Sequence, residues 1–292
     1  FVSRLLDSCD EDELTRRLPH AGLVDVSPRE YRISQAGRAL LGVVGLSACG
    51  GGGSAGASAP TPAADPWQAV SAAVEAAAAD FPSGVTVEIA TPQGVVYSKQ
   101  VGAFSNQTFG EVASASKWVS ASVLLRLVDL GVMSLDTRTG DLLRDSAGQP
   151  WSGNLGSATL RDLLSFQTGI AAETPAIVAL PTLAEAVNYV YEDQRNTARP
   201  PGTFFSYGNN HLKIAARMAE VATGKSWAQI FDEQLRQPLG WSDATAFTFG
   251  SPVDNPNPAG GLVTSGREYM RFLVMQLRRG LDGSNRLLAE AS

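Results

Sequence analysis

The amino-acid sequence predicts an α/β or α+β fold, in which helices pack against a small sheet. Two observations carry this prediction. An amphipathic helix is followed directly by two strand-like segments joined by a tight turn. Several segments with apolar residues at helical spacing then follow, up to the end of the 292-residue chain. A chain of this length is expected to form one large domain with appended segments, and it can bury a sizeable core.

The first predicted elements lie between residues 65 and 98. Apolar residues recur at helical spacing over 67–81, with Asp65 and Pro66 at the start and a Pro-Ser-Gly sequence at 82–84. Residues 85–90 and 95–98 are rich in β-branched residues, and a Pro-Gln-Gly turn at 92–94 separates them. We therefore predict a helix followed by an antiparallel hairpin.

Helices dominate the remainder of the prediction. Apolar periodicity and helix-end signals place them at 115–130, about 159–165, 182–193, 210–222, 226–235 and 266–279. The first of these helices is followed by Gly131, a residue typical of the position after a helix end.

Composition argues against several kinds of partner. The formal net charge is −6, the chain has four lysines, and no run of Lys or Arg resembles a nucleic-acid-binding surface. After residue 49 the only histidine is His211 and there is no cysteine, so a metal site would need almost only carboxylates. We expect no nucleic acid, no metal and no cofactor.

Ser114 and Lys117 are the first candidates for catalysis. They lie three residues apart at the head of the helix predicted over 115–130, and residues at that spacing share one helix face. The lysine amine could therefore take the proton of the serine hydroxyl. The first turn of a helix also presents free backbone N–H groups that stabilise a developing negative charge. His211 is the only histidine after residue 49, so few residues could form a Ser-His-Asp triad, and lysine is the better candidate for the base.

A second pattern follows downstream, where Tyr207 and Asn209 form a Tyr-x-Asn sequence. The order Ser-x-x-Lys and then Tyr-x-Asn resembles the β-lactamase and penicillin-binding protein superfamily, and most closely its class C β-lactamase and esterase branch. Residues 133–136, 163–170 and 259–265 are also similar to the family's "LSLDD", "LLTHTSGL" and "AGGLVST" segments. The resemblance covers about residues 65–292. It implies an α/β (α+β) sandwich, with an antiparallel sheet flanked by helices and a helical subdomain.

The family's third motif, Lys-Thr-Gly or His-x-Gly on a strand lining the site, should follow the 259–265 segment, and neither sequence occurs between that segment and Ser292. The resemblance implies that this strand, which supplies the second oxyanion N–H, follows Ser292. We therefore expect the serine hydrolase domain of residues 65–292 to be incomplete at its C-terminus and inactive by itself. Of the family's sheet, only the hairpin over 85–98 is expected in this chain.

The resemblance implies acyl transfer in two steps, with Ser114 as the nucleophile and an acyl-enzyme that water hydrolyses. Lys117 and Tyr207 form the proton-handling pair, and either could be the base. A free lysine has a pKa of about 10.4, so the pKa of Lys117 would have to fall, which burial favours. Asn209 orients Lys117 and binds the substrate. The expected substrate is an ester, β-lactam or D-amino-acid peptide; the alternative is a catalytically incompetent, penicillin-recognising sensor protein.

The N-terminal part of the sequence predicts export. A short apolar run over 39–48 follows Arg38 and ends in small residues before Cys49, a layout typical of a signal peptide rather than a membrane-spanning helix. The Leu-Ser-Ala-Cys sequence ending at Cys49 resembles a bacterial lipobox. It implies lipidation of Cys49, anchoring to the membrane, and a place in the cell envelope on the periplasmic or extracellular face. Residues 49–64 then form a Gly/Ser/Ala/Pro tether. We expect the protein to be a monomer.

Residues 1–48 thus comprise an upstream segment and the signal peptide. The stretch 1–31 is acidic where a signal peptide should begin with basic residues. Either the true start lies later, at Val24 or Val26, or a small cytosolic domain is fused upstream. The later start agrees better with cleavage at Cys49.

Overall fold

The computed structural model describes residues 24–25, 32–33, 65–171, 173–250, 252–290 and 292. Cys49, the predicted signal peptide and the tether therefore lie outside the described residues. Two short strands upstream, β1 (Val24–Asp25) and β2 (Arg32–Ile33), pair antiparallel. The chain divides into two units, one of residues 1–87 and 97–104 and the other of residues 88–96 and 105–292.

The first unit contains the predicted helix, α4 (Gln68–Ala77), which continues as the 3-10 turn η2 (Ala78–Asp80). Its start is fixed by Asp65, whose carboxylate accepts the Trp67 backbone N–H at 2.9 Å. Strands β3 (Val85–Thr91) and β4 (Gly94–Val101) pair as a hairpin around a turn at residues 92–93. Residues 88–96, which form the end of the hairpin around this turn, belong to the second unit. The Trp67 ring packs on that of Tyr97 with centroids 5.1 Å apart. The predicted helix and hairpin are confirmed.

The second unit holds a three-stranded antiparallel sheet in the order β5-β7-β6. These strands are β5 (Phe109–Glu111), β7 (Leu262–Ser265) and β6 (Ala246–Phe247). Gly110 lies opposite Thr264, and Phe247 lies opposite Leu262, so β7 is the central strand. This sheet is separate from the 85–98 hairpin, and the sequence did not predict its three strands. Strands of two to four residues are too short to show the alternation by which strands are recognised.

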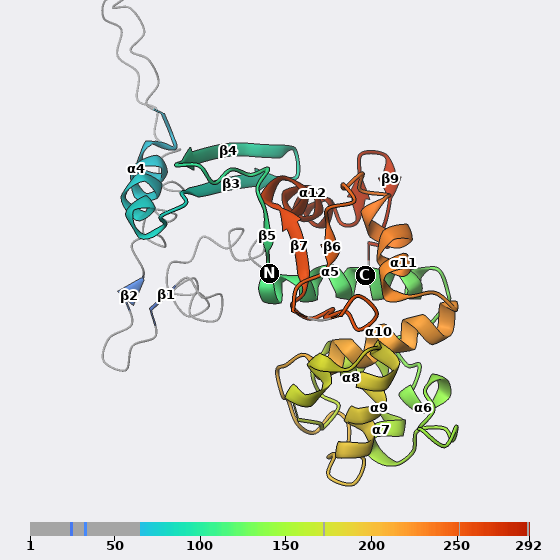
Figure 1. Cartoon of the computed structure of the whole chain (residues 1–292). Helices are drawn as coiled ribbons and strands as arrows, with labels where there is room; N and C mark the ends of the chain where they lie inside the picture. Colours follow the sequence, from blue (N-terminus) through green and yellow to red (C-terminus); the bar gives the residue numbers. More distant parts are fainter. Residues whose placement is uncertain (1–23, 26–31, 34–64, 172, 251, 291) are drawn as a thin grey trace, which may run out of the picture. The chain divides into compact units, whose positions relative to one another are not determined.

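Helix α10 (Asn210–Thr223) is the central helix of this unit. It packs against α5 (Ser116–Asp129) on the side of the sheet and against α8 (Leu160–Leu164) and α9 (Leu183–Gln194) on the other side. Figure 1 shows α10 running between α5 and the group formed by α6 to α9. The unit therefore has a mixed part, with the sheet, and a helical part, as the resemblance implied.

The remaining helices complete these two parts. The helical part also contains α6 (Thr139–Leu142), α7 (Gly153–Ser157) and the 3-10 helix η4 (Pro175–Ala179), none of which the periodicity predicted. The mixed part contains α11 (Trp227–Phe231), its π-helical continuation η5 (Asp232–Arg236), and α12 (Gly266–Leu277). A hairpin of β8 (Leu281–Asp282) and β9 (Asn285–Arg286) follows.

The core explains why α5 and α10 meet. Along α5, Val119, Val123 and Leu127 are buried, and along α10 Ile214 and Met218 are buried. A Leu or Ile side chain contributes about 1.5–3 kcal/mol when fully buried, so this contact fixes the two helices side by side. Their N-terminal ends carry the predicted catalytic residues.

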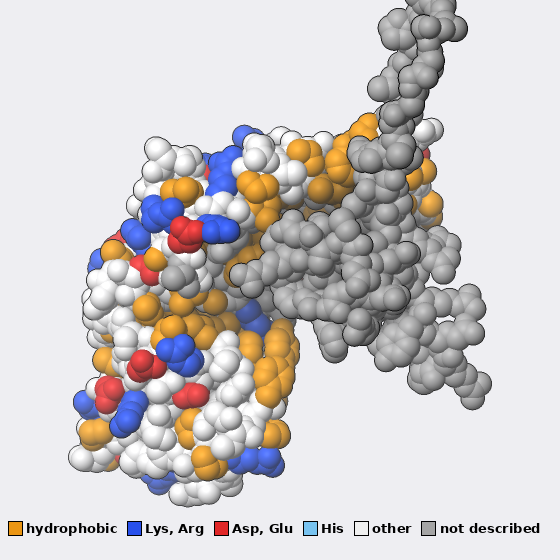
Figure 2. Space-filling model, turned by 180° about the vertical axis from the view of Figure 1, so that it is seen from behind, with side chains coloured by type: hydrophobic (Ala, Val, Ile, Leu, Met, Phe, Trp, Pro, Cys, Tyr) orange, Lys and Arg blue, Asp and Glu red, His pale blue; other side chains and the backbone are white. Residues whose placement is uncertain are grey.

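Figure 2 shows one face of the molecule, on which acidic and basic side chains are interspersed and neither sign forms a continuous block. Within the described ranges, no helix combines the length and the apolar character needed to cross a membrane.

Candidate active site

Ser114 lies in the 3-10 turn η3 (Ala113–Ala115), immediately before α5 rather than inside its first turn as predicted. The residue before it, Ala113, has a φ of +44°, a conformation that residues with a Cβ rarely adopt. Backbone strain of this kind amounts to about 1–3 kcal/mol and persists only where the surroundings enforce it.

Strand β7 and Ser116 enforce it. The Ser116 hydroxyl donates to the Ala113 carbonyl at 2.6 Å and accepts the Leu262 backbone N–H at 3.1 Å. The Leu262 carbonyl in turn accepts the Val112 N–H at 3.1 Å. One residue of the central strand thus holds the turn on both sides of Ala113, and Ser114 is presented from a fixed backbone.

Lys117 lies three residues after Ser114, in the first turn of α5, and three oxygen acceptors surround its side-chain nitrogen. Nζ is 3.2 Å from Ser114 Oγ, 3.2 Å from Asn209 Oδ1 and 2.8 Å from the Ala259 carbonyl oxygen. A charged lysine has three N–H donors, one for each of these oxygens. A neutral amine has two, which the two carbonyl-type oxygens would take, leaving the nitrogen lone pair for the Ser114 hydroxyl. The same geometry therefore serves both protonation states.

Tyr207 completes this group. Its ring centroid is 4.8 Å from Lys117 Nζ, and the side chain is 52% exposed. A hydrogen bond with Ser114 lowers the pKa of Tyr207 most; burial opposes this, and a hydrogen bond with Lys117 and its charge lower the pKa further. The charge of Glu173 acts in the opposite sense. The phenol is thus held against the nucleophile in a setting that favours its ionised form.

His211 is buried and both ring nitrogens are engaged. Nε2 lies 2.7 Å from the Ser206 carbonyl oxygen, to which it must donate, and Nδ1 then accepts from the Thr168 hydroxyl at 2.9 Å. Burial lowers the pKa of His211, so a neutral ring is favoured. The Phe166 ring packs between His211 and Tyr207, with centroids 5.3 Å and 5.2 Å away. His211 therefore supports the segment that carries Tyr207.

Asn209 joins Lys117 to the helical part of the unit. Its side-chain oxygen accepts from Lys117, while its backbone N–H donates to Glu173 Oε1 at 2.9 Å. Glu173 was not singled out from the sequence, because an isolated glutamate in a loop carries no motif. The structure thus brings together all four residues predicted for the site and adds this carboxylate.

The carbonyl of Ala259 is the other contact that the sequence did not identify, although it lies within the 259–265 segment that resembles the family. A backbone acceptor has no residue-type signal. Its loop is held by Ser120, whose hydroxyl donates to the Pro258 carbonyl at 2.6 Å. It is also held by Lys213, whose Nζ donates to Asn255 Oδ1 at 2.6 Å and to the Pro256 carbonyl at 2.9 Å. Burial lowers the pKa of Lys213 to about 8.

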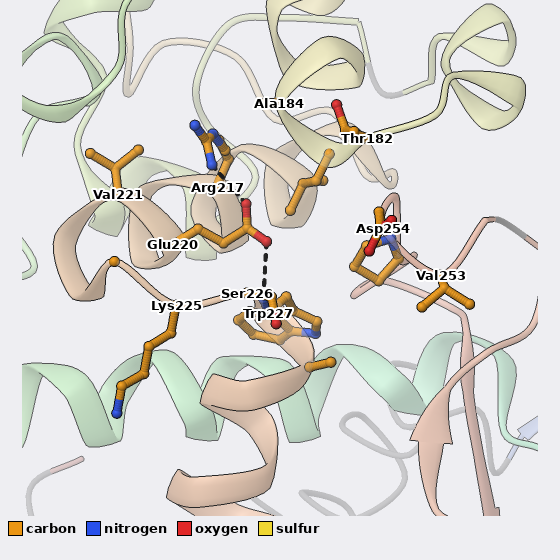
Figure 3. A pocket seen from close by; sticks show the side chains of 14 residues that line it. Thr182, Ala184, Arg217, Glu220, Val221, Lys225, Ser226, Trp227, Val253 and Asp254 are labelled. Carbon is orange, nitrogen blue, oxygen red and sulfur yellow. Dashed lines mark hydrogen bonds and ion pairs between the residues drawn. The ribbon is translucent and has the colours of Figure 1, made fainter.

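A separate hollow of about 620 Å³ lies beside α10 and α11 and contains none of the four predicted site residues. Figure 3 shows its Glu220 side chain turned toward Arg217 and Trp227. One Glu220 oxygen pairs with Arg217 at 2.9 Å and the other accepts the Trp227 backbone N–H at 2.9 Å. Both oxygens of this carboxylate are therefore engaged within the protein.

Known proteins share this sequence and fold. The family model described as Beta-lactamase matches residues 71–292. The chain is 31% identical over 249 residues to "Penicillin-binding protein 4" of Amycolatopsis lactamdurans, covering 74% of this chain and 63% of that protein. It is 26% identical over 188 residues to "D-alanyl-D-alanine-carboxypeptidase/endopeptidase AmpH" of Escherichia coli K12, covering 57% and 48%. The chain thus spans less than two thirds of either curated relative.

Solved structures agree. A Bacteroides dorei protein assigned as a beta-lactamase superposes with a TM-score of 0.67 at 30% identity, covering 77% of this chain and 67% of that one. The octameric penicillin-binding protein homologue from Pyrococcus abyssi superposes with a TM-score of 0.60 at 21% identity, covering 76% and 57%, and this likeness concerns the fold alone. With the family model covering more than half of its length, the chain belongs to the beta-lactamase family of penicillin-binding-protein-like serine hydrolases.

Proposed function

We propose that the protein is a serine hydrolase that forms an acyl-enzyme at Ser114 and acts on an ester, a β-lactam or a D-amino-acid peptide. The observation that carries the proposal is the position of Lys117 Nζ, which lies within hydrogen-bond distance of Ser114 Oγ, Asn209 Oδ1 and the Ala259 carbonyl at once. A lysine used only for solubility has no need of three fixed acceptors.

In the first step Ser114 Oγ attacks the carbonyl carbon and loses its proton to the Lys117–Tyr207 pair. The tetrahedral oxyanion then collapses, and the leaving group departs with a proton from the same pair. In the second step water attacks the acyl-enzyme and gives a proton to the pair. The pair then returns a proton to Ser114 Oγ as its bond to the acyl carbon breaks, which releases the acid and free Ser114. Two proton acceptors lie within reach of Ser114: the neutral amine of Lys117, and the phenolate of Tyr207, whose pKa is lowered.

The backbone N–H of Ser114 supplies one donor to the oxyanion in this proposal. Removal of one such donor typically reduces the rate by about 100- to 1,000-fold. The strained Ala113 fits this role, since a fixed backbone keeps the N–H directed at the same point during the reaction.

The experiment is covalent labelling of the full-length protein with a fluorophosphonate and with a fluorescent penicillin, followed by peptide mass spectrometry. We expect an adduct on Ser114 that is absent in Ser114→Ala and present in Ser165→Ala, which removes an exposed serine hydroxyl. An adduct at another residue would contradict the assignment. Stable labelling without turnover of nitrophenyl esters, nitrocefin or D-alanyl peptides would identify a penicillin-recognising sensor instead.

We also propose that the protein is a lipoprotein of the cell envelope, anchored through Cys49. The apolar run and the small residues before Cys49 support this proposal. Metabolic labelling with an alkyne fatty acid tests it: the label should be lost in Cys49→Ala and retained in Cys9→Ala.

A further inference from the structure

Glu173 connects the proposed reaction site to a second hollow. Its Oε1 accepts the backbone N–H of Asn209 at 2.9 Å, and Asn209 accepts from Lys117, which contacts Ser114. Two residues therefore separate this carboxylate from the nucleophile along a chain of hydrogen bonds. On its other side, Glu173 lines a hollow of about 520 Å³.

The loop that carries Glu173 is fixed by buried polar side chains on both of its flanks. Gln194 accepts the Ala171 N–H at 2.7 Å and donates to Thr174 Oγ1 at 3.0 Å. Asn210 donates to the Ala171 carbonyl at 3.0 Å and to Thr174 Oγ1 at 2.9 Å. These bonds hold Ala171 and Thr174, which lie on either side of Glu173 in the sequence, against two buried side chains. The Glu173 carboxylate is therefore placed before any ligand arrives.

The charge of Glu173 is not neutralised by a neighbour. Within the described ranges no Lys or Arg lies at ion-pair distance from it, and the side chain is exposed. Two other charged groups line the same hollow, Asp193 and Arg199, and they are opposite in sign. The Arg199 guanidinium lies over the Phe204 ring, 4.1 Å from its centroid. The hollow thus carries more negative than positive charge, and its aromatic ring, Phe204, has the Arg199 guanidinium over one face.

We propose that Glu173 is an ammonium-binding subsite, so that the protein prefers acyl substrates that carry a free ammonium group. The ammonium donates to Glu173 Oε2, while Oε1 continues to hold Asn209, and the aliphatic part lies against Phe204. The proposal rests on the proposed hydrolase function, and it names the substrate class within the wide range that this function leaves open.

The experiment compares nitrophenyl esters of ω-amino acids with their N-acetylated counterparts, at two spacer lengths, on the full-length protein. Both esters have the same reacting carbonyl and leaving group. We expect kcat/KM to favour the ammonium ester by about tenfold at one spacer length, the size of one charge-assisted hydrogen bond. The preference should reside mainly in KM and should decline with added salt, because the carboxylate is exposed.

Three variants decide the outcome. In Glu173→Gln, whose side chain still accepts the Asn209 N–H, the ratio of the two kcat/KM values should fall to about one. Glu192→Gln removes the same charge from the exposed side of α9, where Glu192 pairs with Arg195, and it should keep the wild-type ratio. A tenfold ratio that persists in Glu173→Gln would overturn the subsite. If hydrolysis of both esters is the same in Ser114→Ala as in wild type, the proposed function itself fails and the subsite with it.

Discussion

Lys117 and Lys213 are fastened to the same loop. Lys213 Nζ donates to the Pro256 carbonyl at 2.9 Å, and three residues farther along the chain Lys117 Nζ donates to the Ala259 carbonyl at 2.8 Å. Lys213 belongs to α10 and Lys117 to α5, and these two helices pack against each other. The lysine that contacts Ser114 is therefore placed by an acceptor whose own loop depends on a second, 3% exposed lysine.

The first prediction concerns stability and pH. Lys213 has its pKa lowered from 10.5 to about 8 because it is buried. Between these two values the unfolded chain binds the proton and the folded chain does not, so the free energy of unfolding should rise with pH across this window. The contribution is on the order of 3 kcal/mol. The free energy of unfolding, measured with urea, should therefore rise for wild type relative to Lys213→Met from pH 8 to pH 10.5.

Lys225→Met is the control for this measurement, because Lys225 is exposed and pairs with Glu233 at the surface. Its difference from wild type should stay nearly constant over the same window. Parallel curves for Lys213→Met and wild type would show that Lys213 does not titrate as its burial requires.

The second prediction concerns Lys117. Lys117→Ala should reduce kcat/KM for a nitrophenyl ester by about 100- to 10,000-fold, as expected for loss of a general acid–base group. Lys117→Arg should be almost as damaging, because a planar guanidinium cannot converge on three separate oxygens and does not give up its proton. Lys99→Ala, which removes only the ion pair with Glu75 in the first unit, should retain activity. Near-normal hydrolysis by Lys117→Arg would contradict the proposed role.

The third prediction separates the two proton acceptors. The pKa of Tyr207 lies below its ordinary value of 10.0, so its phenolate should form as pH rises toward that value. If this phenolate is the base, kcat/KM should climb with pH along that limb, and the limb should vanish in Tyr207→Phe. Spectroscopic titration of Lys117→Met should show the Tyr207 pKa raised, since a hydrogen bond and a positive charge have been removed.

Tyr189→Phe serves as the matched control, because Tyr189 is exposed on α9 and is not one of the residues of the site. It should leave the pH profile of kcat/KM unaltered. A profile in Tyr207→Phe that keeps the same alkaline limb would assign the base role to Lys117.

The fourth prediction concerns the strained turn. Ser116→Ala removes the buried hydroxyl that bonds both the Ala113 carbonyl and the Leu262 N–H, so two backbone groups lose a partner. We expect a loss of about 1–3 kcal/mol in the free energy of unfolding, together with slower acylation of Ser114. Ser165→Ala, which removes an exposed serine hydroxyl, should change neither quantity. Unchanged acylation in a destabilised Ser116→Ala would show that the strain at Ala113 does not serve the nucleophile.

The long helices could be predicted from the sequence because they have strong local signals, and the four site residues because the order Ser-x-x-Lys and then Tyr-x-Asn resembles the family. Apolar periodicity marks α5, α9, α10 and α12, and each is within two residues of its predicted bounds. Short strands such as β6 lack this advantage, because their two residues are determined by pairing with distant β7. Glu173 and the Ala259 carbonyl escaped for the same reason: their importance comes from where the folded chain places them.

The three acceptors of Lys117 come from chain segments that are remote from one another. The separations along the sequence are 92 residues to Asn209 and 142 residues to Ala259. Local unfolding of either segment would remove an acceptor of Lys117 and make Ser114 unreactive, while most of the helices stayed intact. Reactivity of Ser114 toward a covalent probe should consequently decline at lower denaturant concentration than helical circular dichroism does. The reactivity of Ser114 thus reports whether these distant parts of the chain are correctly assembled.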